Sequence, residues 1–213
     1  CRRRFAQLVN HLPEGAVRVV GTNALREARN RAEFIRRAES IINHQVEVIS
    51  GREEARLIYL GVAHSMPPSP RNRLVVDIGG GSTEFIIGRG MEPLLTESLY
   101  MGCVSYSLAY FPEGRVEKSR MKKAELAARQ ELAGMVRGYR EVGWHEAVGS
   151  SGTIRALADI MQLNGFDDGR ITPGGIERLR SFLLKAGDMS KVQLVGLRPD
   201  RVPVLPGGLA ILN

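Results

Sequence analysis

Apolar and polar positions follow two periods along the chain, and the period changes from one segment to the next. Short β-branched runs predict strands, and longer stretches with apolar residues three and four apart predict helices. Strands are expected at 17–20, 45–49 and 145–148, with a strand–loop–strand hairpin over 74–88. A strand pair is expected over 94–102, with Pro93 setting its turn. Helices are expected at 1–12, 32–42, from 53 onward, and at 105–111, 119–142, 154–163 and 174–186, with a glycine turn at 205–209. This alternation predicts an α/β fold.

The loop of the hairpin has the most distinctive composition, with Gly79, Gly80 and Gly81 in succession. Three glycines leave the backbone unshielded, so several N–H groups can converge on one anion. The next two residues, Ser82 and Thr83, add hydroxyl donors. These groups suit a phosphoryl group, although a plain glycine-rich turn explains the same residues. A Walker A loop is excluded because no lysine follows, and a dinucleotide fingerprint is excluded because a strand follows.

One acidic residue stands at each edge of this loop, Asp77 before it and Glu84 after it. Two carboxylates at this spacing can hold a hard cation such as Mg²⁺, partly through its water ligands. Acidic residues are also common in turns for local reasons, so the pattern alone leaves both interpretations open.

A second glycine–hydroxyl turn joins the strand at 145–148 to the helix at 154–163. Ser151, Gly152 and Thr153 lie where a helix begins, so they can offer donors to a phosphate or a nucleoside. A tight strand–helix turn with no ligand accounts for the sequence equally well.

A third turn follows the first predicted strand, where Thr22 or Asn23 can cap a helix. Arg26 lies one turn further on and can reach an anion at that helix start with its guanidinium. A capped helix with a solvated arginine is the simpler explanation of these residues taken alone.

Composition narrows the classes of partner and compartment. The 213 residues are 43% hydrophobic and 25% charged, which allows one large or two small globular domains. A net charge of +7 favours an anionic partner, but the 6% aromatic content and the lack of a recognition motif argue against nucleic acid. Two cysteines without zinc or disulfide spacing suggest a reducing compartment such as the cytoplasm, and no apolar run approaches a membrane span.

Several motifs in a fixed order carry a resemblance to a known family. Residues 77–84 resemble the second phosphate loop of the actin, Hsp70 and sugar-kinase superfamily. With 21–26, 49–59, 101–105 and 149–153, the chain resembles the exopolyphosphatase and guanosine pentaphosphate phosphohydrolase (Ppx/GppA) family over essentially its whole length. The resemblance implies an actin-like (ribonuclease H-like) two-lobed fold, with residues 1–70 as the remainder of the first lobe and 71–213 as the second.

The resemblance also implies a reaction, the hydrolysis of a terminal phosphoanhydride. Inorganic polyphosphate is the expected substrate, with guanosine pentaphosphate as the alternative. By the resemblance the catalytic residues are Glu54, as general base, and Glu84. Asp77 and Glu84 are metal-associated acids, Arg26 binds phosphate and 79–83 cradle it. Because no Ser, Cys or His stands in a nucleophile motif, water is the expected nucleophile. Glu53 stands at capping-box spacing from Ser50 and is expected to keep a structural role.

The sequence departs from the family pattern in one respect, because no Asp-x-Gly-Ser type first phosphate loop precedes Val17. With no initiator Met, the chain is expected to be a fragment with a truncated first lobe, and inactive or nearly so by itself. The full-length protein is expected to be a homodimer. Two other functions stay open: an ATP-using kinase-like transferase, and a non-catalytic regulator that binds polyphosphate or nucleotide.

Overall fold

The computed structural model of the chain describes residue 7, residue 12 and residues 15–213. The helix expected over 1–12 lies almost wholly outside the described residues. The chain divides into two compact units, residues 1–54 and 55–213, which are described separately below. The lobe boundary expected at residue 70 stays a prediction.

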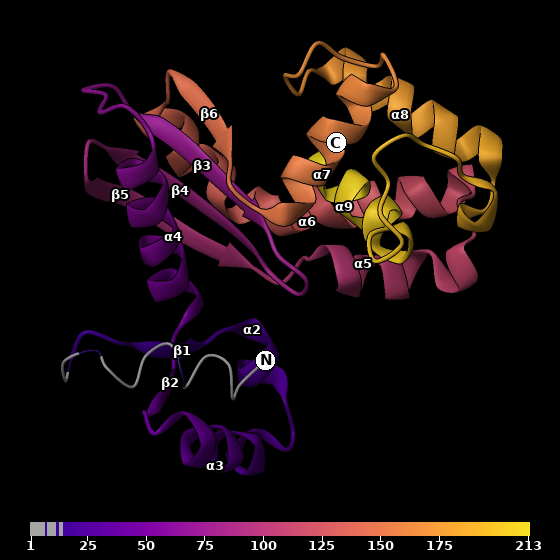
Figure 1. The fold of residues 1–213 in the computed structure, drawn as a ribbon. Helices are drawn as coiled ribbons and strands as arrows, with labels where there is room; N and C mark the ends of the chain where they lie inside the picture. Colours follow the sequence, from indigo (N-terminus) through magenta and orange to yellow (C-terminus); the bar gives the residue numbers. More distant parts are fainter. Residues whose placement is uncertain (1–6, 8–11, 13–14) are drawn as a thin grey trace. The chain divides into compact units, whose positions relative to one another are not determined.

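The first unit is built around two short parallel strands (Figure 1). Val20 of one strand lies opposite Glu47 of the other. The side chains of Ile42, at the end of α3, and Ile49, just after β2, are buried. The helix predicted at 32–42 is confirmed within one residue. The elements are β1 (Val19–Gly21), α2 (Asn23–Glu27), α3 (Arg31–Ile42), β2 (Val46–Val48) and the first turn of α4 (Gly51–Ser65).

The second unit contains a four-stranded sheet in the order β5-β4-β3-β6. Neighbouring strands are antiparallel except β3 and β6, which run parallel. One face packs on α4, where Val75 and Ile86 meet Tyr59, and the other face, including Ile78, joins the larger core. The strands are β3 (Arg73–Ile78), β4 (Thr83–Arg89), β5 (Glu92–Leu99) and β6 (Glu146–Gly149).

Five helices gather beside this sheet and enclose the larger core (Figure 1). In α6 the residues Met121, Ala124 and Ala128 face inward, which confirms the predicted amphipathic helix. No helix in the described part of the chain combines the length and apolar character needed to cross a bilayer. The helices are α5 (Cys103–Tyr110), α6 (Lys118–Val142), α7 (Gly152–Leu163), α8 (Pro173–Ala186) and α9 (Leu205–Leu212).

The strand pair predicted over 94–102 is wrong, because residues 94–99 belong to one strand, β5, at the edge of the sheet, and 100–102 are not in a strand. Pro93 was expected to set a turn, but it lies inside β5 opposite Gly88, at a shift in register. An edge strand tolerates proline because one of its sides needs no ladder hydrogen bond.

The glycine turn predicted at 205–209 is also wrong, because these residues begin helix α9, which is buried along most of its length. A Cβ on Gly207 would collide with the carbonyl oxygen of Cys103 and with Ser107 of α5. The glycines therefore serve the close approach of two helices and not a change of chain direction.

Candidate active site

The two glycine–hydroxyl loops of the second unit meet at one edge of the sheet. They do so because β3 and β6 are adjacent parallel strands, whose carboxyl ends lie at the same edge. The Ser150 N–H donates to the Val76 carbonyl at 3.0 Å, and the Ile78 N–H donates to Ser151 Oγ at 3.2 Å. Both loops line a cleft of about 500 Å³. The structure thus brings two separately predicted phosphate loops into a single site.

The glycine loop after β3 is held from one side by the start of α5. The N–H groups of Cys103 and Val104 donate to the carbonyl oxygens of Gly79 and Gly80, each at 2.9 Å. Because a trans peptide directs its N–H opposite to its C=O, the N–H groups of Gly80 and Gly81 point away from those helix amides. Two successive amides directed the same way form an arrangement that can bind an anion.

This contact also explains why residue 102 is a glycine. A Cβ built on Gly102 would overlap the backbone of Gly80 and Gly81. Close approach to the loop therefore depends on the missing side chain, since a backbone cannot yield as a flexible side chain does.

The hydroxyl groups of the two loops are mostly engaged inside the fold. Ser151 Oγ accepts from the N–H groups of Ile78 and Ile154, at 3.2 and 3.1 Å, so its own proton remains as a donor. Thr83 is fully buried and donates to the Met101 carbonyl at 2.6 Å, and buried Thr153 donates to Cys103 Sγ at 3.4 Å. The buried Ser82 accepts the Gly79 N–H with its carbonyl. Their roles as phosphate ligands stay predictions.

The two acids at the edges of the glycine loop are brought together. Asp77 and Glu84 are direct partners in the antiparallel β3–β4 pairing, so their side chains leave the same face of the sheet. Asp77 accepts a hydrogen bond from Ser150 Oγ at 2.6 Å, and the buried Glu84 accepts one from Ser98 Oγ at 2.8 Å. Burial raises the pKa of the Asp77 carboxyl above its usual value, and the Ser150 hydrogen bond partly opposes this.

These acids fit the donor set that Mg²⁺ prefers. Within the described residues there is no cluster of three or more His, Cys, Asp or Glu side chains that could form an all-protein metal cage. Mg²⁺ is commonly held by one or two carboxylates, with waters and substrate phosphates completing its shell. Asp77 lines the cleft and Glu84 is its strand partner, so the pair supplies that number of carboxylates.

Arg201, which stands in no recognisable sequence motif, lines the same cleft with Asp200. A Cβ added to Gly152 would lie 3.0 Å from Arg201 Nη2, so this guanidinium borders the second loop. Its side chain is 33% exposed and lies 3.6 Å from the Asp200 carboxylate. A cation beside backbone amides strengthens a site for phosphate. The local sequence carries no motif for this role, since the residue reaches the cleft only through the packing of the last segment.

In the first unit the structure brings Arg26 and Glu54 together. Arg26 Nη1 donates to Glu54 Oε2 at 3.0 Å and to the Ile49 carbonyl at 2.9 Å. Both side chains are largely buried, at 17% and 16% exposure. Thr22 occupies the N-cap position of α2, where its carbonyl and not its hydroxyl accepts helix N–H groups, and Asn23 is the first helical residue.

Comparison with known proteins identifies the family. The model of the Ppx/GppA phosphatase family matches residues 1–213. A guanosine-5'-triphosphate,3'-diphosphate pyrophosphatase of Aeromonas hydrophila is 42% identical over 212 residues, which are 100% of this chain and 42% of that protein. The chain therefore spans less than half of this curated relative.

Solved structures agree on the fold. A Ppx/GppA family member from Aquifex aeolicus has a TM-score of 0.77 at 27% identity, covering 99% of this chain and 69% of its own. An exopolyphosphatase from Cytophaga hutchinsonii has a TM-score of 0.80 at 23% identity, covering 99% of this chain and 70% of its own, and supports the fold alone. The chain belongs to the Ppx/GppA phosphatase family, with the α/β actin-like fold expected from its sequence.

Proposed function

We propose that the protein to which this chain belongs hydrolyses a terminal phosphoanhydride and releases inorganic phosphate. The observation that carries the proposal is the meeting of two glycine–hydroxyl loops in one cleft, with Asp77 and Arg201 in its lining. Directed amides and a guanidinium bind phosphate oxygens and stabilise charge that develops on them, which is the main requirement of phosphoryl transfer.

In the proposed reaction the oxygen of a water molecule bonds to the terminal phosphorus, and the bridging P–O bond breaks. The carboxylate of Glu54 takes the proton of that water, as the family resemblance implies. The remaining phosphate leaves with the bridging oxygen and its electron pair. The amides of Gly80 and Gly81 and the guanidinium of Arg201 stabilise negative charge on the phosphate oxygens.

A magnesium ion belongs to this proposal as a cofactor. Asp77, supported by Glu84, would hold it, since these are the paired carboxylates beside the glycine loop. When bound, the ion supplies positive charge that neutralises phosphate oxygens. Ser150 orients the Asp77 carboxylate in any case, through its 2.6 Å hydrogen bond.

Two substrates have support. Inorganic polyphosphate, the substrate expected from the family resemblance, is supported by a structural relative of 27% identity that is named as an exopolyphosphatase-like protein. Guanosine pentaphosphate is supported by the pyrophosphatase that is 42% identical over the whole chain. Both substrates end in the same phosphoanhydride, so the cleft suits either. We also propose that the full-length protein is a homodimer. A reducing compartment such as the cytoplasm is proposed as well, because Cys103 is a buried free thiol.

The test is phosphate release by the full-length protein with Mg²⁺, measured separately with polyphosphate and with guanosine pentaphosphate. We expect kcat/KM to be measurable with at least one of them, and the larger value identifies the preferred substrate. Consumption of ATP that depends on an acceptor alcohol, without release of inorganic phosphate, would instead establish a kinase-like transferase. Tight binding of both compounds without turnover would instead establish a regulator.

A further inference from the structure

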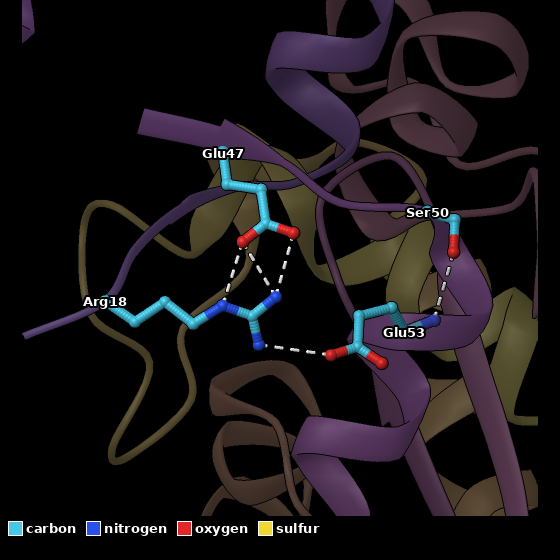
Figure 2. Close-up of polar contacts among 4 residues, drawn as sticks. All are labelled: Arg18, Glu47, Ser50 and Glu53. Carbon is cyan, nitrogen blue, oxygen red and sulfur yellow. Dashed lines mark hydrogen bonds and ion pairs between the residues drawn. The ribbon is translucent and has the colours of Figure 1, made fainter. Parts of the chain in front are cut away.

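Arg18 joins three elements of the first unit through its guanidinium (Figure 2). Its Nε and Nη2 donate to the two carboxylate oxygens of Glu47, each at 2.9 Å. Its Nη1 donates to Glu53 Oε1 at 3.2 Å. Arg18 lies just before β1, Glu47 lies in β2 and Glu53 lies in the first turn of α4. One side chain thus ties the two strands to the beginning of that helix.

The geometry of this cluster is better suited to orienting the Glu53 side chain than to stabilising the fold. Arg18, Glu47 and Glu53 have side chains that are 48%, 55% and 28% exposed. Ion pairs at such exposure contribute little to the free energy of unfolding. The forked contact with Glu47 nevertheless fixes the plane of the guanidinium, so the third nitrogen presents one defined position to Glu53.

The residue after Glu53 is Glu54, the proposed general base, and its carboxylate is held by a second arginine, Arg26. The first turn of α4 is also capped, because Ser50 Oγ accepts the Glu53 N–H at 3.2 Å (Figure 2). Glu53 and Glu54 therefore leave one capped helical turn in two directions, each toward its own arginine. A rotation of this turn that moved Glu53 would move the Glu54 carboxylate too, since neighbouring helical residues share one rigid backbone.

We propose that Arg18 is a positioning residue for Glu54, acting through Glu53 and anchored by Glu47. The inference rests on the proposed function of Glu54 as general base. Arg18 is not a substrate ligand in this arrangement, because each of its three nitrogens donates to one of two carboxylates and the cluster carries one net negative charge. A negative cluster does not attract a polyanion. Loss of Arg18 should therefore affect kcat and leave KM unchanged.

The first test compares Arg18→Ala with Arg137→Ala in the full-length protein. Arg137 forms an exposed ion pair with Glu141 on α6, so its loss is a matched control. We expect Arg18→Ala to lower kcat about two- to fivefold with KM unchanged, and the control to change neither. Arg18→Lys should show a smaller loss in the same direction, because an ammonium keeps the charge and loses the fork. A lower melting temperature with unchanged kcat, or a raised KM, would overturn the proposal.

The second test places Arg18→Ala in a Glu54→Asp background. The shorter acid already holds its carboxylate away from the native position, so we expect Arg18→Ala to lose most of its effect on kcat there. Equal factors in both backgrounds would show that Arg18 acts independently of Glu54, and would overturn the proposal. If Glu54→Gln leaves turnover unchanged, the general base itself is misassigned. That result refutes the proposed mechanism and is separate from a failure of Arg18 alone.

Discussion

The two compact units present their candidate residues in opposite ways. In the first, long charged side chains from separate elements meet through ion pairs, as Arg26 does with Glu54 and Arg18 with Glu53. In the second, the candidate groups are mainly backbone amides and short hydroxyls, and the loops that carry them pack on helix starts such as that of α5. Ion pairs between side chains hold the candidate residues of the first unit in place. In the second unit, glycines without side chains allow the backbone groups to approach closely.

The difference predicts different sensitivities. A site made from ion pairs should keep its activity after small backbone changes and lose activity when one charged group is removed. A site made from glycines should tolerate loss of nearby charge better than the addition of one Cβ. Each of the following substitutions, all in the full-length protein, tests one side of this contrast.

The largest effect is expected from Glu54→Gln. The amide keeps the shape of the side chain and its contact with Arg26 can persist through an oxygen, but it cannot take a proton from water. We expect kcat to fall by about 10² to 10⁴ with KM nearly kept, measured as phosphate release. Glu53→Gln is the control from the same turn and should lower kcat about fivefold at most. Equal losses of kcat in the two variants would show that the negative charge of this helical turn is needed, but would not support Glu54 as the general base.

Gly102→Ala is expected to follow. The new Cβ would strike the backbone of Gly80 and Gly81, so the loop must shift to accept it. A displacement of about 1 Å at a phosphate-binding group can cost about 10² in kcat/KM. Gly134→Ala in α6 is the control, because nothing lies within 4 Å of the Cβ it would add. That variant should keep full activity, and full activity in Gly102→Ala would refute the role of the close approach.

Sequence reasoning succeeded where the signal is local. The loop at 79–83 and the turn at 149–153 were identified because glycines and hydroxyls next to a short apolar run are visible in a few residues. Their meeting follows from the adjacency of β3 and β6, which depends on pairing between strands far apart in the chain. The helix and strand limits were also largely predictable, since hydrophobic period reflects which face is buried.

Sequence reasoning failed where tertiary packing decides. Gly207 was assigned to a turn because glycine is common there, but its use is contact between α9 and α5. Pro93 was assigned to a turn because nothing local shows that β5 is an edge strand. Neither Arg201 nor Arg18 stands in a local motif, because Arg201 reaches the cleft beside Gly152 of α7, and Arg18 meets Glu53 of α4, only through tertiary packing.

Arg201→Ala tests the exception to the contrast, a charged side chain in the cleft of the second unit. A hydrogen bond to a charged group contributes about 1.5–3 kcal/mol, so we expect KM to rise about tenfold or more. The fall in kcat should be smaller, because the amides of the loops remain. Arg129→Ala, on the exposed face of α6, is the control and should leave KM unchanged. An unchanged KM in Arg201→Ala would refute a role for Arg201 in substrate binding and would indicate that backbone groups alone bind phosphate in this cleft.

The smallest effect on catalysis is expected from Thr83→Val, which decides how a buried hydroxyl is used. Thr83 Oγ1 donates to the Met101 carbonyl at 2.6 Å and the residue is fully buried. Removing the hydroxyl leaves that carbonyl without this donor, which costs about 1–3 kcal/mol of unfolding free energy. We therefore expect a lower melting temperature with KM almost unchanged, and near-native values for Thr83→Ser, which keeps the hydroxyl. A raised KM at an unchanged melting temperature would instead show that the Thr83 hydroxyl binds the substrate. In that case the hydroxyl donates to phosphate and not to the Met101 carbonyl, so its removal does not destabilise the fold.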